Sequence, residues 1–183
     1  MRSVMLWTLW GCTLAVTAHS QDPGPQQDTV LATYHETLLA LRDSMVPVRS
    51  AIGQFRRDLQ IAGATTVVNR ATRLTRACAS FKGWVESARA TFRPSAAPSR
   101  AAREASTVFL AQTDGLVGSL NTHCLGGLPP DGPGIWSDSL KAWGPFHTSN
   151  LQRSLLEYDG AMAAFARGVG IRLEPRHPGR FPG

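Results

Sequence analysis

The feature that most constrains this chain is a run of apolar residues spaced alternately three and four positions apart along residues 31–59. Its members are Leu31, Tyr34, Leu38, Leu41, Met45, Val48, Ile52, Phe55 and Leu59. This spacing places every member on one side of an α-helix and is typical of the seam along which one helix packs against others. Pro47 lies inside the run without shifting its phase, so we expect one bent helix rather than two separate helices.

Three further segments repeat this pattern along residues 67–92, 102–120 and 140–165. Their apolar positions are Val67, Ala71, Leu74, Cys78, Phe81, Val85, Ala88, Phe92, Ala102, Ala105, Phe109, Leu116, Leu120, Leu140, Trp143, Leu151, Leu155, Tyr158, Met162 and Phe165. Asp28 and Ser99 suit helix N-caps, Gly63 suits a helix end, and Pro94 and Pro98 mark a turn. No segment of similar length alternates with period two, so strands are not expected.

These segments predict an all-α fold, an up-down-up-down four-helix bundle with long, Pro-kinked first and fourth helices. Pro145 supplies the bend in the fourth helix, and a loop over Leu125–Gly134 precedes that helix. The predicted domain covers residues 28–170, between a flexible lead over 21–27 and a flexible tail over 171–183. Secreted four-helix cytokines have the same number of helices but need long crossover connections, whereas the first two connections here are short.

Residues 1–20 have the features of a cleaved signal peptide. Arg2 is followed by an apolar stretch and then by Ala18-His19-Ser20, which places small side chains where a signal peptidase would cut before Gln21. The apolar stretch has about 13 residues, fewer than the ~20 that span a bilayer, so we expect no transmembrane segment after cleavage. The alternative of a lipoprotein cut at Cys12 is weaker because Trp10 is bulky. We therefore expect an exported protein, either periplasmic or secreted.

Removal of the signal peptide would leave two cysteines, Cys78 and Cys124. In an oxidising compartment two such cysteines usually form a disulfide. A straight hairpin of the second and third helices, however, would place Cys78 opposite Thr113 and leave Cys124 about 16 Å away, beyond the ~7 Å that a bridge allows. The sequence therefore leaves two alternatives: the third helix breaks at Gly115 or Gly118 and the bridge forms, or the thiols stay apart.

Catalytic and metal-binding motifs are missing from the sequence. It contains no P-loop, G-x-G-x-x-G, H-E-x-x-H, G-x-S-x-G or C-x-x-C string, and none of the glutamates in the predicted helical segments, Glu36, Glu86, Glu104 and Glu157, has a His three residues later. We therefore expect a protein that is not an enzyme and has neither a cofactor nor a metal ion. The alternative is a periplasmic cofactor- or metal-binding bundle, in which His147 would bind haem with Met45 or Met162, or a soft metal with Cys78.

Charge is the most informative remaining feature. Nineteen Lys and Arg exceed thirteen Asp and Glu, giving a net charge of +6. His35, Arg42, Arg49 and Arg56 recur every seven residues beside the first seam. Around the first turn the bundle would gather a set of ligand-binding residues, Arg56, Arg57, Arg70, Arg73, Arg76, His123 and Trp136, against a single acid, Asp58. Guanidinium groups bind carboxylate and phosphate in a fixed fork, and an indole ring adds a stacking face.

The leading hypothesis is therefore an exported, non-enzymatic helical bundle that binds an anionic envelope component or a protein partner through its Arg-rich end. Nucleic acid is not the expected partner, because the charge is modest once Arg2 is removed and no nucleic-acid-binding module is recognisable. The sequence determines neither the ligand nor the oligomeric state.

Overall fold

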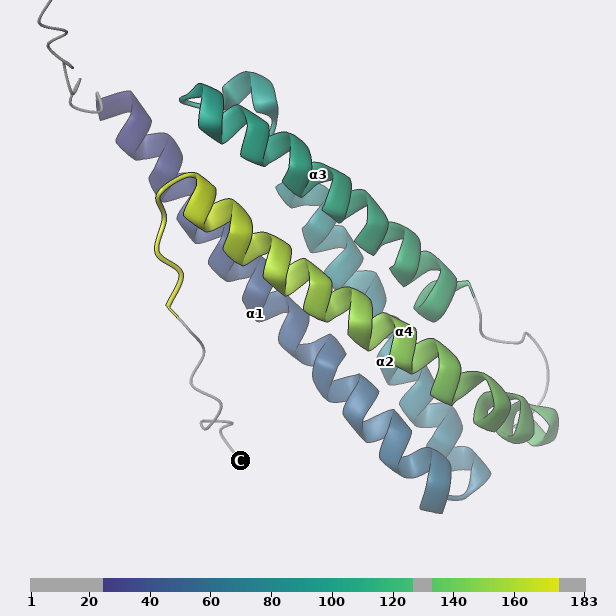
Figure 1. The fold of residues 1–183 in the computed structure, drawn as a ribbon. Helices are drawn as coiled ribbons and strands as arrows, with labels where there is room; N and C mark the ends of the chain where they lie inside the picture. The colour runs from purple at the N-terminus through teal and green to yellow at the C-terminus, as the bar shows by residue number, and fades with distance from the viewer. Residues whose placement is uncertain (1–24, 127–132, 175–183) are drawn as a thin grey trace, which may run out of the picture.

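The structure, a computed structural model, describes residues 25–126 and 133–174, and the regular secondary structure of these residues is helical. Four α-helices lie side by side (Figure 1): α1 Pro25–Ile61, α2 Ala64–Ala88, α3 Arg100–Leu120 and α4 Pro133–Gly168. A short 3₁₀ segment, η1 (Pro94–Ala96), precedes α3, and a π-helical turn, η2 (Asn121–Leu125), follows it. The predicted all-α class and the four helices are confirmed.

The core consists of the apolar seams that the sequence predicts. In the first seam only Leu31 is more than slightly exposed, and every predicted position of the second seam, Phe92 included, is buried. At one end Tyr34, Phe92, Phe109 and Phe165 form an aromatic cluster with ring centroids 5.0–5.4 Å apart. Such ring pairs add about 0.5–1.5 kcal/mol each beyond the burial of their area, so this cluster joins α1, α3, α4 and the segment that follows α2.

Two helix starts differ from the prediction. Helix α1 begins at Pro25 rather than at Asp28, so residues 25–27 belong to the helix and not to a flexible lead. Helix α4 begins at Pro133, inside the expected loop. Proline is favoured in the first turn of a helix, where its missing N–H would have no partner anyway. The predicted signal peptide, the rest of the lead and residues 127–132 of the loop lie outside the described residues.

Both internal prolines lie within continuous helices, α1 running through Pro47 and α4 through Pro145. Gly144, next to Pro145, is buried against α1, where a Cβ atom would meet the side chain of Leu59 and would lie 3.1 Å from the ring of Phe55. The glycine therefore allows α4 to approach α1 closely at this point.

The C-terminal end of α4 turns back through Gly170, which has a φ of 79°. The N–H of Ile171 donates to the carbonyl of Ala166 at 2.7 Å, and the N–H of Gly170 donates to that of Arg167 at 3.2 Å. These two bonds form a Schellman cap, which requires a left-handed residue and therefore favours glycine.

The segment after this cap lies beside α1 (Figure 1), and Ile171 and Leu173 pack against the core. Arg42 on α1 donates to the backbone carbonyl of Glu174 at 2.7 Å. The prediction of a flexible tail over 171–183 is therefore wrong for residues 171–174, while residues 175–183 lie outside the described part of the chain.

A disulfide joins Cys78 on α2 to Cys124 in η2, with the Cα atoms 6.4 Å apart. Helix α3 nevertheless runs unbroken through Gly115 and Gly118, so the break that the sequence analysis required is absent. The bridge forms because α3 is displaced along α2. An ion pair between Arg89 and Asp114 has the same offset. In both pairs the midpoint of the two residue numbers is near 101, whereas a straight hairpin that turns at residue 96 would have its midpoint there.

The displacement has a local cause in the connection between α2 and α3. Its residues Arg93, Ala97 and Ser99 have extended backbone angles around η1, so the chain continues past the end of α2 before it reverses. Ser99 then caps α3 as predicted, its Oγ accepting from the N–H of Ala102 at 3.1 Å. A shift of about five residues in the turning point moves α3 by about ten residues relative to α2, which brings Cys124 level with Cys78.

Candidate functional site

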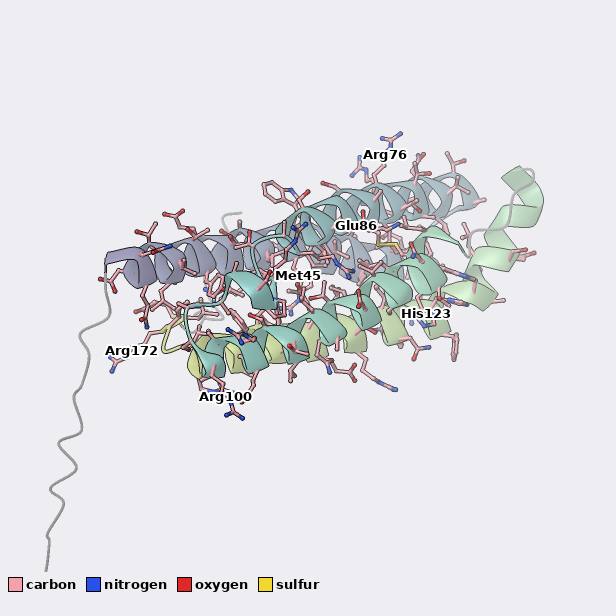
Figure 2. The ribbon with its side chains drawn as sticks, turned by 90° about the horizontal axis from the view of Figure 1, so that it is seen from above. Met45, Arg76, Glu86, Arg100, His123 and Arg172 are labelled. Atoms are coloured by element: carbon pink, nitrogen blue, oxygen red, sulfur yellow. A yellow bond between two sulfur atoms is a disulfide. The ribbon has the colours of Figure 1, made fainter. Side chains whose placement is uncertain are left out.

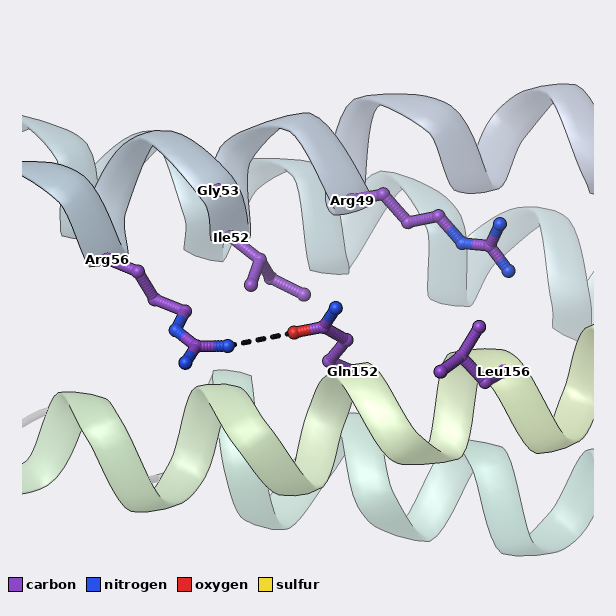
Figure 3. Close-up of a pocket in the computed structure, with 6 residues that line it drawn as sticks. All are labelled: Arg49, Ile52, Gly53, Arg56, Gln152 and Leu156. Carbon is purple, nitrogen blue, oxygen red and sulfur yellow. Dashed lines mark hydrogen bonds between the residues drawn. The ribbon is translucent and has the colours of Figure 1, made fainter. Parts of the chain in front are cut away.

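The predicted ligand-binding residues do not form one surface. Figure 2 shows Arg76 pointing away from the bundle on the α2 side and His123 on the opposite side, near α3 and α4. Arg56 faces α4, where its Nη1 donates to Oε1 of Gln152 at 2.9 Å (Figure 3). Trp136 lies in the first turn of α4, and its side chain is outside the described part of the structure.

Arg70 takes part in the contact between α1 and α2. Its Nε donates to Asp58 at 2.6 Å and its Nη1 to Gln54 at 2.9 Å, both on α1. Asp58 is the single acid near the first turn, so its charge compensates Arg70 rather than the neighbouring arginines. We therefore assign Arg70 a structural role in holding the α1–α2 hairpin.

The remaining three predicted arginines, Arg57, Arg73 and Arg76, are exposed and make no hydrogen bond or ion pair with any residue that the structure describes. A helix rotates by about 100° per residue, and this rotation carries all three away from the core toward the outer face of the α1–α2 pair. We call these three residues the basic surface. Ile61, at the tip of α1 beside it, is 84% exposed.

The stripe of basic residues that recur every seven positions on α1 lies along the boundary with α4. Arg49 donates to Asp159 and to the carbonyl of Leu155, both at 3.2 Å, while Arg42 contacts the tail and Arg56 contacts Gln152 as described above. Three of the four stripe residues therefore attach the C-terminal part of the chain to α1. The sequence places the stripe beside the seam but does not show which helix it faces.

Between Arg49 and Arg56 lies a cavity of about 450 Å³, which Figure 3 shows at the junction of α1 and α4. It is lined by Arg49, Ile52, Gly53, Arg56, Gln152 and Leu156. Asp159 compensates the charge of Arg49, whereas the only partner of Arg56 among the described residues is the neutral Gln152. The cavity can therefore accept an apolar group with one anionic end at Arg56. Its two walls are about 100 residues apart in the chain, so no local sequence pattern predicts this cavity.

A pair of histidines faces each other between η2 and α4. The Nδ1 atoms of His123 and His147 are 3.1 Å apart, a hydrogen-bond distance at which one nitrogen donates and the other accepts. The ring of Trp143 stacks on His147 with the centroids 4.5 Å apart and the planes 7° apart. Burial, and secondarily the charge of His123, lower the pKa of His147 below its ordinary 6.5. No local spacing predicts this pair, since the two residues are separated by 24 positions.

The residues considered for a cofactor do not come together as expected. The disulfide leaves no free thiol at Cys78 for a soft metal. Gly144 packs against Leu59 near the end of α1, and His147 lies one turn further along α4. Met45 precedes Leu59 by fourteen residues in α1, so it lies far from His147.

Two negative findings concern the described residues alone. Within 25–126 and 133–174, no group of three or more His, Cys, Asp or Glu side chains is placed to hold a metal ion. In the same ranges, no helix combines the length and the apolar character needed to cross a membrane.

The core also contains polar groups that the apolar seams do not predict. Ser106, Thr113 and Thr148 are buried, and Thr148 Oγ1 donates to the carbonyl of Gly144 at 2.6 Å. Burial raises the pKa of the Tyr158 hydroxyl to about 12, so this group stays protonated at any physiological pH. These residues lie among packed helices, and we assign them to the core rather than to a site.

Comparison with known proteins shows no family for the chain: no family model matches it, and neither a curated protein nor a solved structure is significantly similar.

Proposed function

We propose that this chain is an exported, non-enzymatic helical bundle that binds an anionic envelope component through its basic surface, Arg57, Arg73 and Arg76. The observation that carries the proposal is that these three guanidinium groups are exposed and uncompensated by the residues described, while Arg70 uses the nearby acid. Free guanidinium groups bind phosphate and carboxylate in bidentate geometry, and several together favour a polyanionic partner.

The architecture in this proposal is an up-down-up-down bundle with bends at Pro47 and Pro145. The course of the colours along α1, α2, α3 and α4 in Figure 1 supports alternating helix directions. Loss of a backbone hydrogen bond at each proline supports the bends. Such a rigid bundle would hold the arginines at fixed spacing on the outer face of α1 and α2.

Anionic lipid headgroups are the partner that this surface fits best. Ile61 is exposed beside the basic surface, and an apolar side chain next to basic residues suits the boundary between headgroups and acyl chains. Each basic residue near an anionic membrane surface contributes about 1 kcal/mol, so three of them would give weak, salt-sensitive binding.

The test compares two triple variants with the same change in charge. R57Q/R73Q/R76Q removes the basic surface, whereas R93Q/R103Q/R167Q removes three exposed arginines near the opposite end of the bundle. In sedimentation with phosphatidylglycerol vesicles at low salt, we expect the first variant to lose binding and the second to keep it. Phosphatidylcholine vesicles and 0.5 M salt should abolish binding of the unmodified protein.

Two results would contradict the proposal. If both triple variants lose binding equally, only net charge matters and the basic surface is not a site. If the unmodified protein does not bind anionic vesicles at low salt, the lipid partner is wrong, and capture of a protein from the envelope fraction that depends on the same three arginines would favour a protein partner.

A further inference from the structure

We propose that His123 and His147 form a binding site for a divalent transition-metal ion, with Cu²⁺ bound most tightly. This inference goes beyond the proposed function and rests on a different part of the molecule, the junction of η2 and α4 (Figure 2). Imidazole nitrogen is a good ligand for copper, nickel and zinc, and among these ions a given nitrogen site binds Cu²⁺ most strongly.

The spacing of the two nitrogens suits such an ion. Metal–imidazole bonds are about 2.0–2.1 Å long, so an ion bound to two nitrogens 3.1 Å apart would subtend an angle of about 95–102°. This angle lies between the 90° of square-planar and the 109° of tetrahedral coordination. The two histidines can therefore act as neighbouring ligands without a change in their separation, and water would complete the coordination.

Both rings are held in place from outside the pair. Trp143 stacks on His147, and Phe146 contacts both histidines edge-on with ring centroids 5.2–6.2 Å away. His123 precedes Cys124, whose disulfide attaches η2 to α2. A ligand pair fixed in this way loses little conformational entropy on binding. π-helical turns such as η2 also occur preferentially at functional sites.

Metal binding requires a change of tautomer but no net loss of protons. In the metal-free pair one Nδ1 carries the shared proton and the other accepts it. When the ion replaces that proton, the donor ring takes a proton at Nε2 instead, by exchange with solvent, and both Nδ1 lone pairs become available. The disulfide, which leaves Cys78 without a free thiol, holds η2 and therefore His123 in place, so the protein ligands of the proposed site are two imidazole nitrogens.

The experiment uses the full chain without a histidine tag and three single variants. H123Q and H147Q each remove one ligand, and H35Q is the matched control because His35 lies on α1 away from the pair. Cu²⁺, Ni²⁺ and Zn²⁺ are titrated by calorimetry, and Cu²⁺ is also followed by tryptophan fluorescence, since Trp143 adjoins the site. We expect one Cu²⁺ per chain, affinity at least tenfold weaker in H123Q and in H147Q, and no change in H35Q.

Electron paramagnetic resonance of the Cu²⁺-loaded unmodified protein provides a readout that does not depend on how the variants fold. We expect nitrogen couplings from two imidazoles, reduced to one in each ligand variant. The proposal is overturned if the unmodified protein shows fewer than two coordinated imidazoles, or if H123Q and H147Q bind Cu²⁺ as tightly as H35Q does.

Discussion

The disulfide between Cys78 and Cys124 allows a quantitative prediction about stability. The bridge connects residues 46 positions apart in the sequence. In the chain-entropy model, closing a loop of that length in the unfolded state stabilises the folded protein by about 4 kcal/mol. Reduction should therefore lower the free energy of unfolding by about that amount and the melting temperature by about 8–16 °C for a domain of this size. The helices themselves should persist, because the seams do not depend on the bridge.

The assay is thermal and urea unfolding followed by circular dichroism, with and without a reducing agent. Reduction of the unmodified protein isolates the effect of the loop. C78A, C124A and the double variant should all resemble the reduced protein, because loss of either sulfur opens the same loop. Both cysteines are almost completely buried, so each alanine also leaves a small cavity, and the variants should be slightly less stable than the reduced protein.

A melting curve that does not change on reduction, with labelling of two thiols confirming that reduction took place, would show that the bridge does not stabilise the fold. Effects of C78A and C124A that add up in the double variant would also refute a stabilising bridge, since independent losses mean that the two residues are not linked. In either case the bridge would not stabilise the displaced register of α3 against α2, and R89Q/D114N would test whether the ion pair with the same offset does.

Three further predictions concern single positions. Gly170→Ala should destabilise the protein by about 1–2 kcal/mol in urea unfolding, because alanine tolerates the left-handed conformation poorly. Pro47→Ala should raise the free energy of unfolding by about 1–3 kcal/mol through the recovered hydrogen bond, whereas a lower melting temperature would show that the packing depends on the proline. Because the pKa of His147 is lowered on folding, the unfolded chain binds more protons than the folded chain near neutral pH. The contribution of His147 to the free energy of unfolding should therefore be fully present above pH 6.5 and decrease on acidification. H147Q, measured in EDTA, should lack this pH-dependent contribution.

The sequence alone determined most of the buried apolar positions and the number of helices. Burial of a seam depends on the 3.6-residue period of the helix and on the apolar character of its members, both of which are local properties. For the same reason Ser99 was recognisable as the cap of α3, and the phase preserved across Pro47 indicated one continuous helix. The basic character of the first turn was also visible, since charge counts require no fold.

The tertiary structure decided how the helices are aligned and which polar groups meet. The extended residues between α2 and α3 set the register that joins Cys78 to Cys124, and the same register places η2 opposite α4. Small changes in backbone angles within a connection shift a whole helix, so the periodicity of each helix carries no information about them. The pairing of His123 with His147 follows from this alignment, and the pairing of Arg70 with Asp58 follows from the packing of α2 against α1, so neither could be derived from a single segment.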